Sequence, residues 1–144
     1  MLQKTAKAAW EYGRQFLLQG RVADYIPELA KANPVYLGLC VKTVDGQTIE
    51  YGDVEQRFTM QSICKVASLA AALQHDGSGE FAVRVGMPAK SGVGGGIMAC
   101  VENQLGIGTY GPALDEKGNS IGGKNALEYL SREMHYHIFD SERD

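Results

Sequence analysis

Two pairs of strand-like segments, each joined by a short turn, constrain this chain more than any other feature. The apolar segment 35–44 leads into Asp45-Gly46 and then into a second strand-like run, a setting in which an Asp-Gly pair favours a tight hairpin turn. The segments 95–101 and 105–111 are predicted to form a second hairpin. Strands joined by tight turns run antiparallel, so the sequence predicts an antiparallel sheet.

Helices are predicted before, between and after the two hairpins. They are expected at residues 5–18, 27–32, 62–73 and 126–134. The first has apolar residues at helical spacing, and the third is rich in alanine and leucine without an internal glycine or proline. The last is expected to be capped by Asn119 or Ser120. Helices that bracket an antiparallel sheet predict an α+β fold, with the sheet flanked by helices.

Length and composition narrow the class of protein. A chain of 144 residues suits a single domain with a substantial core, and a net charge of -3 gives no basic surplus for binding nucleic acid. No apolar run is long enough to span a membrane, and the first residues lack the features of a secretory signal, so we expect a cytoplasmic protein. The cysteines are odd in number and lie in apolar runs, which predicts reduced core thiols at Cys40, Cys64 and Cys100.

Three sequence patterns suggest ligand sites but do not meet the requirements of those sites. The glycine cluster at 92–96 lacks the spacing of a dinucleotide-binding loop. The segment 118–125 resembles a phosphate-binding loop, but Asn125 stands where a serine or threonine must hold magnesium. His135 and His137 are two residues apart and so lie on different helix faces, which favours surface histidines over metal ligands. We therefore expect no metal site.

Ser62 and Lys65 form an S-x-x-K element near the start of the third predicted helix. Residues three apart share a helix face, so the lysine amine can take the proton of the serine hydroxyl as that oxygen attacks. Alone, the pair is better explained as a capping serine beside a solvated lysine. Lys90-Ser91-Gly92 changes this interpretation, because penicillin-recognising serine enzymes carry K-[ST]-G on an edge strand that closes the oxyanion hole beside the nucleophile.

Longer stretches of the chain resemble one known family, the serine-dependent glutaminases, which share the penicillin-recognising fold. The resemblance runs over nearly the whole chain, and its most specific pieces are QSICK at 61–65 and PAKSGVGGG at 88–96. It implies the α/β lobe of a β-lactamase or transpeptidase-like fold. It also implies hydrolysis of L-glutamine to L-glutamate and ammonia through an acyl-enzyme, with L-glutamine as the small-molecule partner and no metal or organic cofactor.

The same resemblance implies roles for individual residues. Ser62 would be the nucleophile and Lys65 its proton acceptor, and the backbone N–H groups of Ser62 and Val93 would form the oxyanion hole. Gln61 and Tyr25 would contact the substrate. Nucleophile and oxyanion hole are therefore both encoded in this chain.

The chain departs from the family at one place. Family members carry a long, largely helical segment before the SGEFA stretch, and its asparagine, glutamate and tyrosine side chains hold the amino-acid ends of glutamine. Here only residues 74–77 bridge the gap, so we divide a single truncated domain into residues 1–73, this junction and residues 78–144. His75 stands where the family has a catalytic tyrosine, and we interpret it as an accident of the junction, with a proton relay as the alternative.

Three hypotheses follow for the function. The first is a glutaminase whose activity is impaired or lost because the substrate is no longer held at both ends. The second is a non-catalytic oligomerisation or regulatory module, because loss of a lobe would uncover apolar surface on residues 62–73 and around Phe81. The third is a small esterase or penicillin-binding activity of Ser62. We expect a homo-oligomer.

Overall fold

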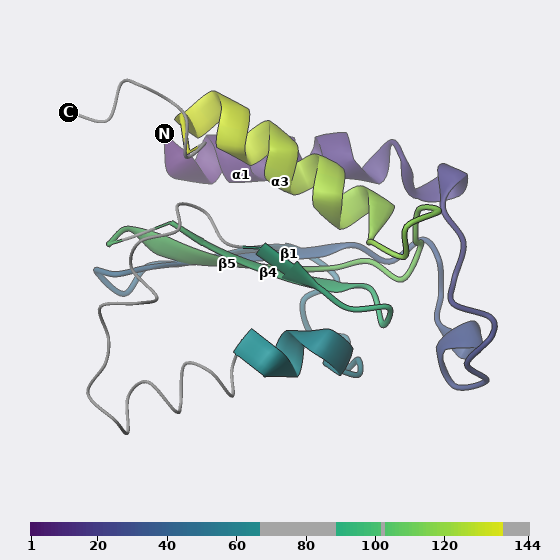
Figure 1. Ribbon diagram of the computed structural model, residues 1–144. Coiled ribbons are helices and arrows are strands. Elements are labelled where there is room, and N and C mark those ends of the chain that lie inside the picture. The colour runs from purple at the N-terminus through teal and green to yellow at the C-terminus, as the bar shows by residue number, and fades with distance from the viewer. Residues whose placement is uncertain (67–88, 102, 137–144) are drawn as a thin grey trace, which may run out of the picture.

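The computed structural model describes residues 1–66, 89–101 and 103–136 of the chain. In these ranges a five-stranded antiparallel sheet has the order β2-β1-β5-β4-β3, and two long helices cover one of its faces (Figure 1). The strands are β1 Gly38–Thr43, β2 Thr48–Gly52, β3 Ala89–Ser91, β4 Gly96–Val101 and β5 Leu105–Tyr110. The helices are α1 Leu2–Arg14 and α3 Ile121–Met134. This arrangement confirms the predicted α+β fold.

Both predicted hairpins are present and form most of the sheet. In the first, β1 pairs with β2 so that Val41 lies opposite Ile49. Gly46 at its tip has a φ of 95°, a left-handed conformation that glycine adopts without strain. In the second, β4 pairs with β5, and β5 also pairs with β1, which places Ile107 opposite Val41. Local turn chemistry therefore determines the strand pairs, and pairing of β1 with β5 joins them.

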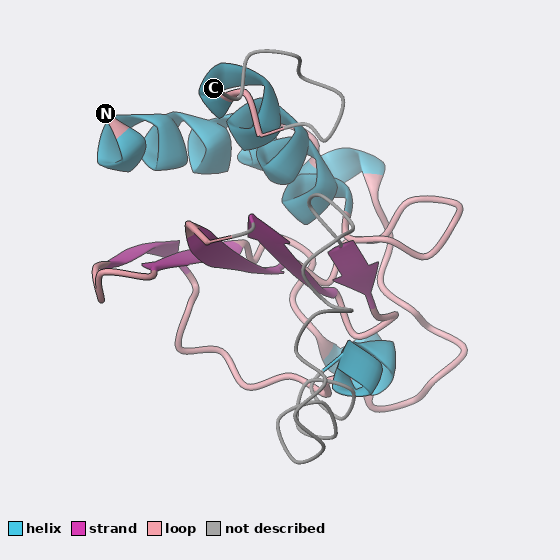
Figure 2. Ribbon diagram, turned by 60° about the vertical axis from the view of Figure 1, so that its left-hand side comes forward, coloured by secondary structure: helices cyan, strands magenta, loops and turns pink. Residues whose placement is uncertain are grey.

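The core lies between the sheet and the two helices because alternate residues of each strand point to this face. Leu39 and Val41 of β1, Ala99 of β4 and Ile107 of β5 are each at most 2% exposed. They pack in one cluster with Ala6 and Ala9 of α1 and Leu127 and Leu130 of α3. Figure 2 shows both helices on this side of the sheet and the short segment that contains Ser62 on the other.

The helices differ from the sequence prediction mainly at their ends. α1 ends at Arg14, and a single 3-10 turn, Leu17–Gln19, completes the predicted segment. The expected helix 27–32 is only the 3-10 turn Leu29–Lys31. Of the expected helix 62–73, the 3-10 turn Gln61–Ile63 and helical residues 64–66 are described, and the rest lies outside the described residues. No helix in the described ranges is both long and apolar enough to cross a membrane.

α3 begins five residues earlier than predicted, at Ile121. Ser120 caps it as expected, because its hydroxyl accepts a hydrogen bond from the N–H of Gly123 at 3.1 Å. Gly122 and Gly123 are poor helix formers, which is why the helix was predicted to begin only at residue 126. The structure explains them by packing, since a side chain on Gly122 would lie 2.6 Å from the methyl carbon Cδ2 of Leu17.

The predicted core cysteines are not in the core. In the described ranges all three are free thiols, but Cys40 is half-buried, and Cys64 and Cys100 are exposed. Cys40 of β1 and Cys100 of β4 alternate with the core residues of their strands and line a cavity with Ile63 on the other sheet face, so apolar neighbours in sequence did not imply burial. Desolvation nevertheless raises the pKa of both of these thiols, which keeps them protonated at neutral pH.

Where α1 crosses α3, the two backbones meet at Gly13 and Gly122. A side chain on Gly13 would collide with the carbonyl oxygen of Gly122 and would lie 3.0 Å from the Cβ of Ala126. The helices can approach this closely only because both positions lack a side chain. This contact accounts for Gly122, whereas Gly123 packs against Thr109 and Gly118 has a positive φ of 79° in the turn before α3.

We predict that Gly13→Ala destabilises the protein although alanine favours a helix. The backbone oxygen of Gly122 cannot rotate away, so an overpacking cost of roughly 2–3 kcal/mol exceeds a propensity gain of about 1 kcal/mol. Urea unfolding followed by circular dichroism measures the change. Gly106→Ala is the control, because no atom in the described part of the chain lies within 4 Å of a Cβ built there. Equal or greater stability of Gly13→Ala would contradict the close helix contact.

Candidate functional site

The S-x-x-K segment and the K-S-G segment meet where the chain leaves the edge strand β3. A Cβ built on Gly92 would lie 3.0 Å from both the Cβ of Gln61 and the carbonyl oxygen of Met60, and 3.3 Å from the backbone nitrogen of Ser62. Such distances are tighter than ordinary van der Waals contact, so a side chain at this position would displace its neighbours. The structure therefore brings together two motifs that are far apart in sequence.

Ser62 lies in a strained turn that is anchored to the sheet. Gln61, the residue before it, has a φ of 49°, which is uncommon for a side chain of this size and costs on the order of 1–3 kcal/mol. The anchors are Ile63, which is buried, and Phe58, whose ring stacks on Tyr110 with centroids 4.6 Å apart. Ser62 itself is half-buried. Strain held in place by packing is typical of a functional segment.

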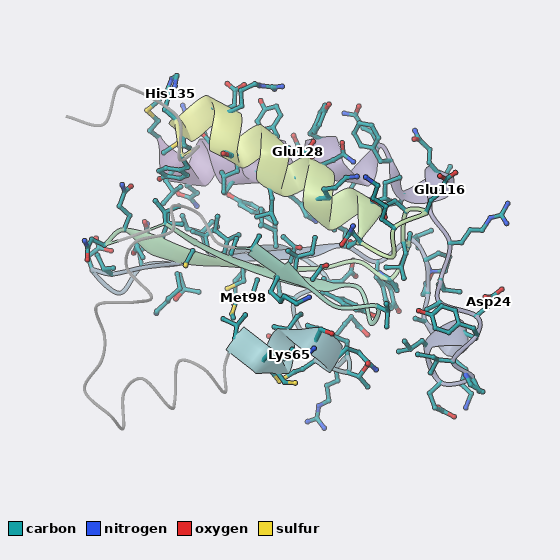
Figure 3. The ribbon with its side chains drawn as sticks, viewed as in Figure 1. Asp24, Lys65, Met98, Glu116, Glu128 and His135 are labelled. Atoms are coloured by element: carbon teal, nitrogen blue, oxygen red, sulfur yellow. The ribbon has the colours of Figure 1, made fainter. Side chains whose placement is uncertain are left out.

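Lys65 follows Ser62 by three residues on the same short helical segment, on the sheet face opposite α1 and α3 (Figure 3). Its side chain is exposed. Within the described part of the chain, no hydrogen bond joins the Ser62 hydroxyl to the Lys65 amine. Such contacts commonly tighten only when a substrate binds, so the spacing remains compatible with proton transfer.

The K-S-G residues take part in hydrogen bonds at the end of β3. Lys90 is half-buried, and its Nζ donates to the carbonyl oxygen of Ser91 at 2.8 Å. The hydroxyl of Ser91 donates to Oδ1 of Asn119 at 2.6 Å. β3 forms an edge of the described sheet, as the K-S-G motif predicts, and pairs with β4 through Ser91 opposite Ile97.

A turn that precedes α3 supports this end of β3. The carboxylate of Asp115 accepts hydrogen bonds from the backbone N–H groups of Lys117 and Asn119, each at 3.0 Å, and from Nζ of Lys124 at 2.8 Å. Burial acts to raise the pKa of Asp115, but the Lys124 contact and these N–H groups together hold that pKa below its usual value. Asp115 is therefore ionised at neutral pH and fixes the turn.

Tyr25 and Val93 line one cavity of about 640 Å³. The other wall of this cavity comes from the turn that contains Asp115 and Gly118. Val93 directly follows Gly92, so this cavity adjoins the contact between Gly92 and Ser62. Tyr25 and Val93 therefore share a cavity whose lining does not include Ser62, and His75 and Phe81 lie outside the described residues.

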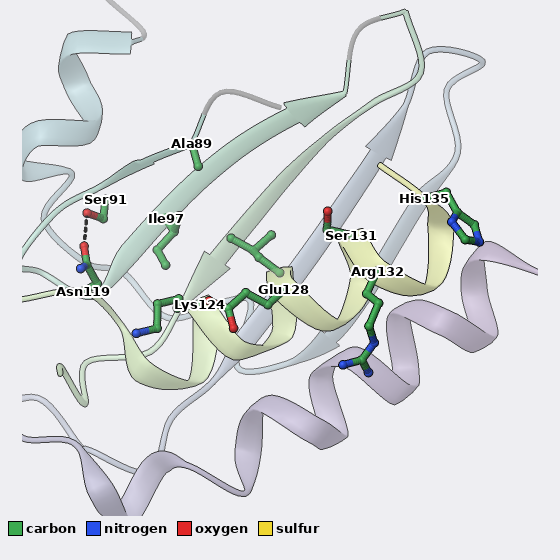
Figure 4. Close-up of a pocket in the computed structure, with 10 residues that line it drawn as sticks. Ala89, Ser91, Ile97, Asn119, Lys124, Glu128, Ser131, Arg132 and His135 are labelled. Atoms are coloured by element: carbon green, nitrogen blue, oxygen red, sulfur yellow. Dashed lines mark hydrogen bonds between the residues drawn. The ribbon is translucent and has the colours of Figure 1, made fainter. Parts of the chain in front are cut away.

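A second cavity, of about 790 Å³, lies between β3 and α3 (Figure 4). Ile97 and Leu127 supply apolar walls, and the Ser91–Asn119 hydrogen bond lies at one end. From the amino-acid sequence, Asn119 is predicted only as a candidate helix cap. The spacing of Asp115, Gly118 and Asn119 before a helix is a signal for a turn, but it carries no information about a contact with Ser91.

Comparison with known proteins gives the family. The family model described as "Glutaminase" matches residues 20–77 and 74–139, which together make up most of the chain. This chain belongs to the glutaminase family. A glutaminase of Clostridioides difficile (strain 630) is 50% identical over 94 residues, which cover 65% of this chain and 30% of that protein. A glutaminase of Bacillus cytotoxicus is 54% identical over 77 residues, or 54% of this chain and 25% of that protein. The chain thus spans less than a third of the length of these two relatives.

Solved glutaminase structures share the fold. A probable glutaminase named ybaS aligns with a TM-score of 0.81 at 19% identity, over 97% of this chain and 98% of that one. A probable glutaminase from Bacillus subtilis, complexed with 6-diazo-5-oxo-L-norleucine, aligns with a TM-score of 0.73 at 22% identity, over 92% and 94% of the two chains. These likenesses establish the β-lactamase-like fold that the resemblance in sequence implied.

We predict that Gly94→Ala loosens the turn that carries Ser62. A Cβ at this position would lie 2.6 Å from the carbonyl oxygen of Thr59, so residues 59–62 must move away. Amide hydrogen exchange measures the effect at Ile63, whose N–H bonds to the carbonyl oxygen of Met60 at 3.0 Å. We expect exchange there to accelerate about tenfold, equivalent to roughly 1.4 kcal/mol. Gly108→Ala, whose added carbon has no atom of residues 1–66, 89–101 or 103–136 within 4 Å, should leave exchange at Ile63 unchanged.

Proposed function

We propose that this chain retains the nucleophilic half of a glutaminase site, while its hydrolysis of L-glutamine to L-glutamate and ammonia is severely reduced or lost. The close approach of Gly92 to the Ser62 backbone nitrogen carries the proposal. That approach puts the start of the S-x-x-K helix beside the residue that precedes Val93, as an oxyanion hole built from the N–H groups of Ser62 and Val93 requires.

The reaction would proceed in two steps. Ser62 Oγ attacks the side-chain carbonyl carbon of glutamine, and the Lys65 amine accepts the hydroxyl proton. The N–H groups of Ser62 and Val93 donate to the oxyanion of the tetrahedral intermediate. Collapse of that intermediate breaks the C–N bond, and the proton returns through Lys65 to the leaving ammonia. Water then attacks the acyl-enzyme, releases glutamate and restores the Ser62 hydroxyl.

Two findings support impairment of this reaction. The two segments that match the family overlap at residues 74–77, which is the junction inferred from the sequence, and the chain covers only 30% of the C. difficile relative. The family resemblance assigns the contacts with the amino-acid ends of glutamine to the segment absent at that junction. Tyr25 and Gln61 remain, but both are exposed. A poorly held substrate loses the orientation on which much of the rate depends.

Two probes test the reactivity of Ser62 and the binding of the amino-acid substrate separately. p-Nitrophenyl acetate acylates an activated serine without amino-acid contacts, whereas 6-diazo-5-oxo-L-norleucine, which reacts covalently with the B. subtilis glutaminase YbgJ, resembles glutamine. We predict an acetyl adduct on Ser62 in peptide mass spectra, together with slow labelling by the diazo compound and ammonia release at least about 100-fold below that of a full-length relative.

Matched variants test both parts of this prediction. Ser62→Ala should abolish the adduct, and Thr48→Ala, at an exposed position on β2, should leave it unchanged. Absence of an adduct on Ser62 in the folded protein would refute the assignment of Ser62 as the nucleophile. Ammonia release that depends on Ser62 and matches the rate of a full-length relative would refute the impairment.

A second candidate function is self-association through the uncovered face of the sheet. Among the described residues, no atom lies within 4 Å of a Cβ built on Gly106 or Gly108 of β5, and both glycines line a largely apolar cavity of about 660 Å³ with Met98 and Ile63. An open apolar groove of this kind favours an interface with a second copy of the chain.

We predict a concentration-dependent dimer in sedimentation velocity and a monomer for Gly108→Glu, because a carboxylate in an apolar interface lacks a partner. Thr48→Glu places the same charge on β2, outside the cavity, and should leave the dimer intact. A monomeric wild-type protein at the highest concentration reached would exclude this function.

A further inference from the structure

We propose that Asn119 is a positioning residue for the nucleophilic half-site. Its carboxamide holds the hydroxyl of Ser91 and thereby keeps residues 91–93, including the N–H of Val93, against the turn that carries Ser62. The inference rests on the proposed function, since it gives Asn119 a part in that same site.

The hydrogen bond between Ser91 and Asn119 supports a weak part of the sheet. At 2.6 Å it is short, and both residues are half-buried (Figure 4). β3 consists of only three residues, Ala89–Ser91, and within the described ranges it pairs with β4 alone. A short edge strand has few backbone hydrogen bonds to fix its end. The tether at Ser91 therefore acts where the strand is least constrained.

Asn119 is a firm anchor because its own backbone is held on both sides. Its N–H donates to the Asp115 carboxylate at 3.0 Å, and its carbonyl oxygen accepts from the N–H of Asp115 at 2.8 Å. The salt bridge from Lys124 of α3, at 2.8 Å, ties the same carboxylate to the helix. Little conformational freedom remains to be lost when the carboxamide binds Ser91.

The same turn also lies beside Val93, across one cavity. A Cβ built on Gly118 would lie 3.6 Å from the Cγ1 methyl of Val93, which is ordinary van der Waals distance. Between the two contacts, Gly92 donates to the carbonyl oxygen of Gly96 at 3.0 Å and accepts from the N–H of Gly95 at 2.9 Å, which closes the loop after β3. The turn thus binds Ser91 and lies close to Val93, on either side of Gly92. Displacement of this loop would misalign the Val93 N–H, and oxyanion-hole donors act only within about 2.7–3.1 Å of the oxyanion.

A double-mutant cycle tests the proposal. The readout is the second-order rate constant for acylation of Ser62 by p-nitrophenyl acetate, measured with the melting temperature of each variant. Asn119→Ala and Ser91→Ala should each slow acylation about five- to tenfold, and the double variant should be no slower than either. Asn119→Asp retains an acceptor oxygen at this position and should restore most of the rate. Lys117→Ala changes an exposed side chain in the same turn and should acylate at the wild-type rate.

The outcomes separate this inference from the proposed function. Multiplicative losses in the double variant, or a wild-type rate for Asn119→Ala, would overturn the positioning role. A lower melting temperature with an unchanged acylation rate of the folded protein would also overturn it, because it indicates a purely structural contact. If wild-type Ser62 is not acylated, the proposed function fails. Amide exchange at Gly92 and Gly95 then tests separately whether Asn119 holds the loop after β3 in place. Asn119→Ala should then accelerate exchange at these amides and not in β1, and unchanged exchange would refute it.

Discussion

The close backbone contact between α1 and α3 is the constraint on which the rest of the structure depends. Gly13 and Gly122 let the first and last described helices cross without side chains between them, so two ends of the chain together cover one face of the sheet. This contact fixes where α3 begins, and Ser120 caps it there. The turn before Ser120 is joined to the edge strand β3 by the hydrogen bond between Ser91 and Asn119. Helix packing and the candidate site are therefore connected through a few neighbouring residues.

Glycine serves a second purpose on the other side of the sheet. Where α1 crosses α3, the absence of side chains at Gly13 and Gly122 lets the two helices approach closely. At Gly92 and Gly94, it lets a loop pass against the backbone of Thr59 through Ser62. The strained turn at Gln61 lies at this second contact, and the packing of Ile63 and Phe58 offsets the cost of that strain. Both contacts are decided by backbone distance, and neither leaves room for a methyl group.

Membership of the glutaminase family and the short length of the chain point in different directions. The family match covers most of this chain, whereas the chain covers less than a third of the C. difficile and B. cytotoxicus relatives. The S-x-x-K and K-S-G motifs are present, and they meet in space. The nucleophile and the substrate contacts are separable parts of such a site, because attack and oxyanion stabilisation use a few adjacent groups, while orientation of the substrate needs contacts along its whole length.

Features that depend on neighbouring residues could be predicted from the amino-acid sequence: the two hairpins, a helix cap at Asn119 or Ser120, and the S-x-x-K and K-S-G motifs that the family shares. Only the tertiary structure decided which residues from distant segments meet. The contact of Ser91 with Asn119 was not predicted, and the predictions of a later start for α3 and of core positions for Cys64 and Cys100 were wrong. Turn and cap propensities act over a few residues, whereas burial and tethering depend on distances that the folded chain alone sets.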